Sequence, residues 1–200
     1  ACHNPAYVYK YNMVQELVDG GTFLLNCPWD MEGLEAHLPG QVKAYIADHN
    51  IKFYTIDGIK IGKETGMGNR INTVLQAAFF KLSDIIPIKD AVKYMKEAAT
   101  RSYSKKGEAI VKMNHDAIDA GVKGIVEVKV PASWKTAKDT KMGMGKVKAA
   151  NKTLTNYVNN IQIPVNAQQG DKLPVSTFKD MADGTFPQGS AAFEKRGIAV

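Results

Sequence analysis

The chain has 200 residues, of which 44% are hydrophobic and 23% charged, and its formal net charge at pH 7 is +6. This composition is typical of a folded globular protein and excludes a fibrous or disordered chain. No apolar run approaches the roughly 20 residues that a membrane-spanning helix needs, so we expect no membrane partner. The two cysteines, Cys2 and Cys27, are too few for a disulfide framework or an iron–sulfur site. They favour a reducing compartment such as the cytoplasm.

The first third of the chain alternates strand-like and helix-like segments. A short apolar strand is expected at Thr22–Asn26 after a Gly-Gly turn signal, and a second at Ile51–Asp57, where apolar and polar residues alternate. Two helical segments, Glu32–Leu38 and Gln41–His49, lie between them and are divided by Pro39-Gly40. The order strand, helix, helix, strand predicts an α/β layer with a parallel strand pair.

Three helices are expected next, at Arg70–Leu82, Lys89–Ser102 and between Gly107 and Gly121. The first has one continuous apolar stripe, which predicts that this face packs against the sheet. The stripe consists of Ile71, Val74, Leu75, Ala78, Phe79 and Leu82. Residues Ile125–Val130 then alternate like an edge strand that Pro131 stops.

The remainder of the chain has a different composition. Between Lys135 and Lys152 there are six lysines and one acid, Asp139, so we expect residues 131–152 to be a solvated connection that does not order itself. No aromatic residues alternate with these lysines as single-strand binders require, so we expect no nucleic-acid partner. Turn-forming residues dominate residues 153–200, which predicts a small loop-rich domain. The predicted fold class is therefore α/β, a partial layered sheet with packed helices followed by that small domain.

No segment shows a complete catalytic constellation. The four histidines are scattered and have no metal-ligand spacing, so no metal site is expected. Asn114-His115-Asp116 lie next to each other on a helix and point in different directions, which favours a surface or capping role. Cys27 ends the first strand, where α/β proteins place functional groups, but a buried structural thiol is the favoured reading.

The segment Gly66–Asn72 combines two glycines with Arg70 and Asn72 at the expected start of a helix. A helix N-terminus exposes unpaired N–H groups, and an arginine beside it adds donors that match phosphate or carboxylate. An anion pocket is one interpretation of this segment. An ordinary turn with a helix cap is the other, because glycine turns before helices are common.

Several strings together resemble the pyruvate:ferredoxin (flavodoxin) oxidoreductase family. They are Ala1–Pro5, Gly21–Asn26, Pro28–Trp29, Phe53–Asp57, Gly68–Thr73, Ser104–Glu108, Val111–Asn114, Asn166–Gln168, Gly170–Ser176, Gly184–Gly189 and Glu194–Val200. The resemblance covers nearly the whole chain, except for the stretch Thr136–Lys152. It implies that residues 1–130 are the later part of a gamma-type 2-oxoacid oxidoreductase domain. Residues 153–200 would then be the small domain named for Glu194-Lys195-Arg196, the EKR linker domain.

The resemblance also implies a function. The family oxidatively decarboxylates pyruvate on thiamine diphosphate, passes electrons through [4Fe-4S] clusters to ferredoxin or flavodoxin, and transfers acetyl to coenzyme A, as a homodimer in an anaerobic compartment. This chain, which does not begin with methionine, is expected to be an internal fragment that is inactive alone and binds neither thiamine diphosphate nor clusters. The residues that the resemblance implies as coenzyme A contacts are Arg70, Asn72, Lys112 and Asn114. It implies no catalytic residue in this chain. The alternative is a noncatalytic scaffold or dimer-contact module that binds no ligand.

Overall fold

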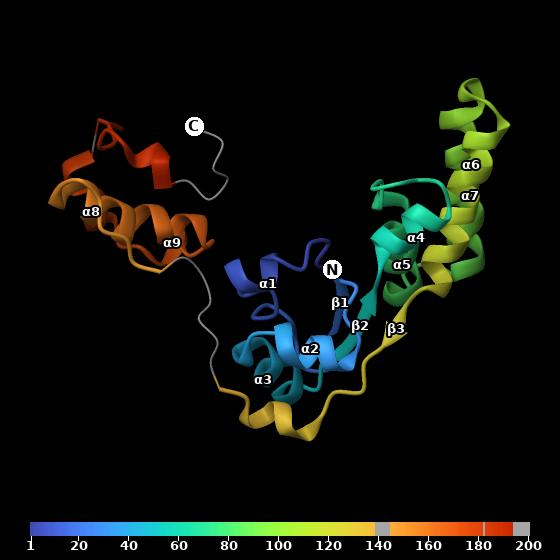
Figure 1. Ribbon diagram of the computed structural model, residues 1–200, viewed down its shortest axis with the longest axis horizontal. Coiled ribbons are helices and arrows are strands. Elements are labelled where there is room, and N and C mark those ends of the chain that lie inside the picture. The colour runs from blue at the N-terminus through green and yellow to red at the C-terminus, as the bar shows by residue number, and fades with distance from the viewer. Residues whose placement is uncertain (139–144, 182, 194–200) are drawn as a thin grey trace. The chain divides into compact units, whose positions relative to one another are not determined.

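The computed structural model describes residues 1–138, 145–181 and 183–193 (Figure 1). The chain divides into two compact units: the first contains residues 1–8 and 12–140, and the second residues 9–11 and 141–200. Asp139 and the Glu194-Lys195-Arg196 motif lie outside the described residues.

A three-stranded mixed sheet of order β1-β2-β3 forms the centre of the first unit. Strand β1 (Thr22–Asn26) pairs in parallel with β2 (Lys52–Ile56), and Phe23 lies opposite Phe53 in the register. The short β3 (Val126–Glu127) pairs antiparallel with β2 at the other edge. The parallel pair and the edge strand predicted from the sequence are thus confirmed, although β3 is shorter than the predicted six residues.

Short helices connect the elements of the first unit. They are α2 (Met31–His37), α3 (Gly40–Asp48) and α4 (Gly58–Glu64). Helix α1 (Tyr7–Lys10) precedes them, and its residues Tyr9 and Lys10 are assigned to the second unit. The side chains of Asp30 and Asp57 cap α2 and α4 by accepting hydrogen bonds of 2.9 Å from the backbone N–H groups of Gly33 and Lys60. Aspartate is a preferred cap because its oxygen satisfies an N–H group that has no partner inside the helix. The two helices predicted between the strands are confirmed.

Three longer helices follow: α5 (Asn72–Ser83), α6 (Ile88–Tyr103) and α7 (Glu108–Lys123). The prediction was wrong in two details of α5. The helix begins at Asn72 instead of Arg70, and Phe79 is 45% exposed while Ala77 is fully buried. The physical reason for the burial of Ala77 is that α5 packs on α6 and α7 as well as on the sheet, so its buried side is wider than one stripe.

Gly121 lies inside α7 and does not end it, which corrects the expectation that this glycine brackets the helix. A Cβ atom at Gly121 would lie 2.5 Å from the carbonyl oxygen of Val74 and 3.1 Å from the Cβ of Ala77. The missing side chain therefore lets α7 approach the backbone of α5 closely. The close approach of α7 to α5, and not the end of a helix, explains why position 121 is a glycine.

The start of the predicted solvated connection is folded into the first unit. Residues Ala132–Thr136 form a 3-10 helix, and Trp134 within it is only 1% exposed. Its indole N–H donates a hydrogen bond to Glu35 of α2, and its ring contacts Phe53 at a centroid distance of 6.2 Å. The expectation that residues 131–152 do not order themselves is wrong here, because one large aromatic side chain is enough to anchor the segment.

The second unit is more helical at its start than the predicted loop-rich domain. Helix α8 (Lys152–Tyr157), a π-helical turn (Val158–Gln162) and α9 (Ile163–Asn166) follow one another without a break. Three short 3-10 helices, Gly170–Lys172, Val175–Met181 and Ser190–Phe193, come after them. Buried apolar side chains of this helical run are Leu154, Val158 and Ile161.

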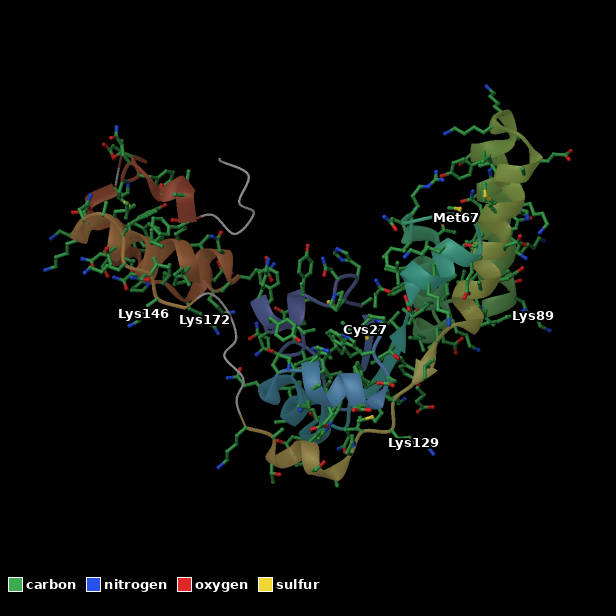
Figure 2. The ribbon with its side chains drawn as sticks, viewed as in Figure 1. Cys27, Met67, Lys89, Lys129, Lys146 and Lys172 are labelled. Carbon is green, nitrogen blue, oxygen red and sulfur yellow. The ribbon has the colours of Figure 1, made fainter. Side chains whose placement is uncertain are left out.

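The lysine-rich stretch is also held at its far end. The amide of Asn159 both accepts from the backbone N–H of Val147 (2.9 Å) and donates to its carbonyl (2.8 Å). The backbone N–H of Ala149 donates to the hydroxyl of Thr155. Figure 2 shows Lys89, Lys129, Lys146 and Lys172 pointing away from the ribbon, and all four are exposed.

A buried amide joins three segments at the carboxyl edge of the parallel strands. Residue Asn26, 5% exposed, donates from its side chain to the carbonyl of His3 (2.9 Å) and accepts from the backbone N–H of Gly58 (2.8 Å). Beside it, Cys2 forms an isolated parallel bridge with Leu25. The N-terminal segment, the end of β1 and the start of α4 are thereby linked.

Candidate functional site

The predicted tight turn between α4 and α5 is confirmed. Gly66 (φ 80°) and Gly68 (φ 62°) both adopt left-handed backbone conformations that favour glycine. The N–H of Gly68 donates to the carbonyl of Gly62 at 3.0 Å, which closes the turn against the preceding helix. The N-terminus of α5 follows directly after this turn.

Arg70 lies in this turn and is exposed. Its Nε donates a 3.3 Å hydrogen bond to the carbonyl of Met67, and within the described part of the chain its terminal guanidinium nitrogens have no hydrogen-bond partner. The residue before the first turn of α5, Ile71, provides no side-chain cap. A guanidinium with unused donors thus stands beside a helix N-terminus whose first N–H groups have no side-chain partner, which is a favourable arrangement for an anion.

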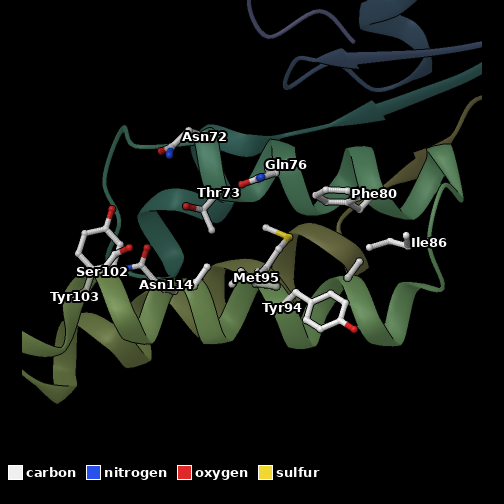
Figure 3. A pocket seen from close by; sticks show the side chains of 14 residues that line it. Asn72, Thr73, Gln76, Phe80, Ile86, Tyr94, Met95, Ser102, Tyr103 and Asn114 are labelled. Carbon is white, nitrogen blue, oxygen red and sulfur yellow. The ribbon is translucent and has the colours of Figure 1, made fainter.

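A pocket of about 360 Å³ lies between α5, α6 and α7 (Figure 3). Polar side chains gather at one end of it, namely Asn72, Thr73, Ser102, Tyr103 and Asn114, and apolar ones line the other end, including Phe80, Ile86 and Met95. Small residues of α6, Ala91, Ala98 and Ala99, leave the space open. The volume lies within the range of about 300–1,000 Å³ that is usual for small-molecule sites.

The structure brings two of the four predicted site residues together. Both Asn72 and Asn114 line the pocket between the helices, although they are 42 positions apart in the chain. Neither Arg70 nor Lys112 lines it. The Lys112 ammonium instead pairs with Asp116 at 2.6 Å, one turn along the exposed side of α7.

Asn114 is buried, which corrects the expectation of a surface or capping role for the group Asn114-His115-Asp116. The side chain is 2% exposed because position 114 of α7 faces α5 and α6. Its amide nitrogen donates to the carbonyl of Ile110 at 2.8 Å, but Oδ1 is buried without a hydrogen-bond partner among the described residues. Sequence reasoning missed this orphan acceptor, since a polar residue on a helix carries no signal of burial.

A second cavity, of about 480 Å³, lies at the carboxyl edge of β1 and β2 and is lined by Cys27, Asp57 and Lys60 among others. Burial is the main cause that raises the pKa of the Cys27 thiol to about 11. At neutral pH the group is therefore protonated and a poor nucleophile. Both cysteines are free and buried, in agreement with the predicted structural thiol.

Metal-binding clusters and membrane-spanning helices do not occur in the described ranges. No group of three or more histidine, cysteine, aspartate or glutamate side chains there is placed to hold a metal ion. Likewise, none of the helices in that part of the chain is long and apolar enough to cross a membrane.

Two family models match the chain. The model described as pyruvate ferredoxin/flavodoxin oxidoreductase matches residues 1–124. The second, EKR, is described as a domain of unknown function and matches residues 145–199. Together they cover most of the first unit and nearly all of the second.

Curated relatives match over the full length of the chain. The pyruvate-flavodoxin oxidoreductase of Enterobacter agglomerans is 44% identical over 200 residues, and the pyruvate:ferredoxin oxidoreductase of Moorella thermoacetica is 44% identical over 203 residues. The pyruvate dehydrogenase [NADP(+)] of Cryptosporidium parvum is 38% identical over 221 residues. The chain covers 16%, 16% and 11% of these proteins, respectively. From the model that matches residues 1–124, we conclude that the chain belongs to the pyruvate ferredoxin/flavodoxin oxidoreductase family.

Proposed function

We propose that this chain is part of an enzyme that oxidatively decarboxylates pyruvate to acetyl-coenzyme A and passes the electrons to ferredoxin or flavodoxin. Its own contribution is to bind coenzyme A and to contact neighbouring domains. Residues 1–130 are the later part of the gamma-type domain, 131–152 the connection and 153–200 the EKR domain. Thiamine diphosphate and [4Fe-4S] clusters belong to other parts of the enzyme, since a cluster needs four thiolates and the chain has two.

The names of the relatives support a role in the pyruvate half of the reaction. Three different electron acceptors occur in those names, flavodoxin, ferredoxin and NADP(+), whereas pyruvate occurs in every one. All three proteins match this chain from end to end. Enzymes with different electron acceptors share this segment. We therefore infer that it serves a step that these enzymes have in common, and not the selection of the electron acceptor.

The observation that carries the proposal is the unused guanidinium of Arg70 beside the uncapped start of α5. Coenzyme A carries several phosphate oxygens, and an arginine donates to such oxygens through two parallel N–H groups. Asn72, the first residue of α5, adds a directional hydrogen bond at the edge of the pocket. Lys112 and Asn114 are the further proposed contacts, and Lys112 would have to leave Asp116 to take part.

The test is Arg70→Ala in the complete enzyme. Hydrogen bonds to a charged group contribute about 1.5–3 kcal/mol, so the KM for coenzyme A should rise about tenfold or more while the KM for pyruvate stays unchanged. Lys89→Ala is the matched control, because Lys89 is also an exposed cation but lies in the first turn of α6, at the opposite end of that helix from Ser102 and Tyr103. A lower melting temperature with unchanged coenzyme A kinetics would assign Arg70 a purely structural role and reject the contact.

A noncatalytic contact module is the second candidate function, and exposed apolar side chains on α5 and the segment after it favour it. Phe79 is 45% exposed and Ile85 68% exposed. Such residues suit a contact with other domains of the enzyme or with a second subunit of a homodimer. Phe79→Ser with Ile85→Ser should then lower the stability of the assembled enzyme, whereas coenzyme A kinetics should not respond.

A further inference from the structure

A third cavity is a groove of about 700 Å³ that lies entirely within the second unit. Residues between 153 and 161, on α8 and the π-helical turn after it, form one of its walls. Residues between 176 and 187, which lie beside that helical run in Figure 1, form the other. The volume is within the range that is usual for binding sites. None of the proposed coenzyme A contacts lines this groove, so that role does not account for it.

The helical wall of the groove is lined mainly by polar side chains. Thr153, Asn156 and Asn160 face the groove at helical spacing, together with the ring of Tyr157. A helix face that packs on its own domain is normally apolar, and this run already buries such a face inside the unit. Asn160 also lies in the π-helical turn, a rare conformation that is frequent at functional sites. Packing within the unit therefore does not explain the polar face.

The two asparagines of this face have unused hydrogen-bonding groups. The side chains of Asn156 and Asn160 are exposed and have no hydrogen-bond partner within the described part of the chain. A side-chain amide both donates and accepts, which matches the N–H and C=O groups of a polypeptide backbone. A helix rises about 5.4 Å per turn, and alternate residues of an extended chain are about 6.6 Å apart. Two amides one turn apart can therefore bind an extended backbone at two points.

The rest of the lining restricts the side chains that such a segment carries. The rings of Tyr157 and Phe186 lie with their centroids 5.8 Å apart, and Phe186 is 65% exposed. An apolar side chain of the occupant would cover this aromatic wall. Lys179 is the one charged side chain among the described lining residues, and it has no ion-pair partner in that part of the chain. A carboxylate of the occupant is its matching partner.

We propose that the groove binds an extended polypeptide segment from the remainder of the enzyme, with one apolar and one acidic side chain directed into it. Asn156 and Asn160 bind the backbone of this segment, Phe186 and Tyr157 contact its apolar side chain, and Lys179 pairs with its carboxylate. The chain covers only 16% of its relative from Enterobacter agglomerans, so most of the complete polypeptide lies outside it. The inference rests on the proposed function in one respect, the contact with neighbouring domains, and specifies where the second unit makes that contact.

Photo-cross-linking in the complete enzyme tests the proposal. Benzoylphenylalanine placed at Thr153 or at Thr177, on opposite walls of the groove, should cross-link on irradiation to the same segment outside residues 1–200, which mass spectrometry identifies. The same probe at Lys172, an exposed position of the second unit outside the lining, should not reach that segment. The proposal is overturned if neither groove position gives such a product, or if Lys172 gives the same one.

Substitutions in the groove separate binding from folding. Asn156→Ala with Asn160→Ala should lower the cross-link yield from position 177 about fivefold or more, because two hydrogen bonds are lost. The melting temperature of the 200-residue chain should not change, since neither amide has a partner in its described part. Gln188→Ala, an exposed amide outside the lining, is the matched control. Lys179→Glu should lower the yield as well, whereas Lys179→Arg should not. An unchanged yield in the double variant contradicts the proposed groove.

These experiments also distinguish the inference from the proposed function. If the groove positions give no cross-link but Arg70→Ala raises the KM for coenzyme A, the groove is wrong and the coenzyme A role stands. If the cross-link forms and Arg70→Ala leaves coenzyme A kinetics unchanged, the groove stands and the coenzyme A contact fails.

Discussion

The two units of the chain are held together in different ways. Fully buried apolar side chains of the first unit come from several elements, including Leu25 of β1, Phe53 of β2, Val42 of α3 and Val74 of α5. In the described part of the second unit from residue 145 onward, the buried apolar side chains come from one helical run. There, amide side chains reach distant backbone: Asn159 binds Val147, and Gln162 donates to the carbonyl of Ser190 at 2.9 Å.

Burial of apolar area therefore stabilises the first unit, whereas polar side-chain contacts to the backbone are more important in the second. Apolar burial contributes roughly 25 cal/mol per Å² and is spread over many residues. A side-chain hydrogen bond contributes about 1 kcal/mol and depends on one residue. Substitutions should accordingly have their largest effects on packing in the first unit and on single amides in the second.

Trp134→Ala should have the largest effect on stability. Removing a fully buried tryptophan costs about 3–5 kcal/mol of unfolding free energy, which urea denaturation will measure. Trp134→Phe keeps most of the ring and removes the hydrogen bond to Glu35, so it should lose much less. A loss below about 1 kcal/mol for the alanine variant would mean that this segment is a solvated connection after all.

Gly121→Ala should destabilise the first unit by about 1–3 kcal/mol through overpacking against α5. The sign of the change in unfolding free energy is informative, because Gly→Ala in an exposed helix stabilises a protein by about 1 kcal/mol. Gly145→Ala is the control, since a Cβ atom there would meet nothing within 4 Å. Thermal unfolding of the two variants decides the matter, and a stabilised Gly121→Ala would show that α7 does not approach α5 so closely.

Asn159→Ala should weaken the second unit by about 1–3 kcal/mol, because both hydrogen bonds to Val147 are lost. Hydrogen exchange at the Val147 amide should accelerate by the corresponding factor, while amides of β1 and β2 keep their rates. Asn159→Asp, which retains the acceptor and loses the donor, should give an intermediate result. Equal acceleration in the sheet would contradict the distinction between the two units.

The smallest effect concerns Glu35. Hydrogen bonds from Trp134 and from Lys43 lower the pKa of its carboxyl below the usual 4.5. Its contribution to stability is therefore complete above that unfolded-state pKa and is lost as the pH falls through the lower folded-state value. With a side chain 55% exposed, the contribution should stay below about 1 kcal/mol. Melting temperatures between about pH 6 and pH 3 should fall less steeply for Glu35→Gln than for the unsubstituted chain.

Periodicity and turn chemistry were sufficient to predict the parallel strands, the helices between them and the three long helices. These two signals failed where a single tertiary contact determines the local structure. Trp134 is surrounded by residues typical of a connection, and Gly121 resembles a helix end, yet both are packed against other elements. The helical run 152–166 was missed because Asn159, Asn160 and Pro164 indicate turns. Pro164 lies directly after the π-helical turn Val158–Gln162, so the helical run continues through a residue that usually ends or kinks a helix.

The candidate site was predictable only in part. The glycine turn and the position of Arg70 follow from local sequence, since φ > 0 at Gly66 and Gly68 is a property of glycine. The meeting of Asn72 with Asn114 depends on how α5 and α7 pack, and no spacing along the chain encodes it. The orphaned oxygen of Asn114 depends on that packing as well.

The buried amide of Asn26 has a consequence for the dynamics of the sheet edge. Because one side chain binds the carbonyl of His3 and the N–H of Gly58 at once, neither segment can separate from β1 without leaving one end of the buried Asn26 amide unsatisfied. We therefore expect the local opening of the N-terminal residues and of the first turn of α4 to be coupled through the end of β1, and hydrogen exchange at these segments to respond together to Asn26→Ala.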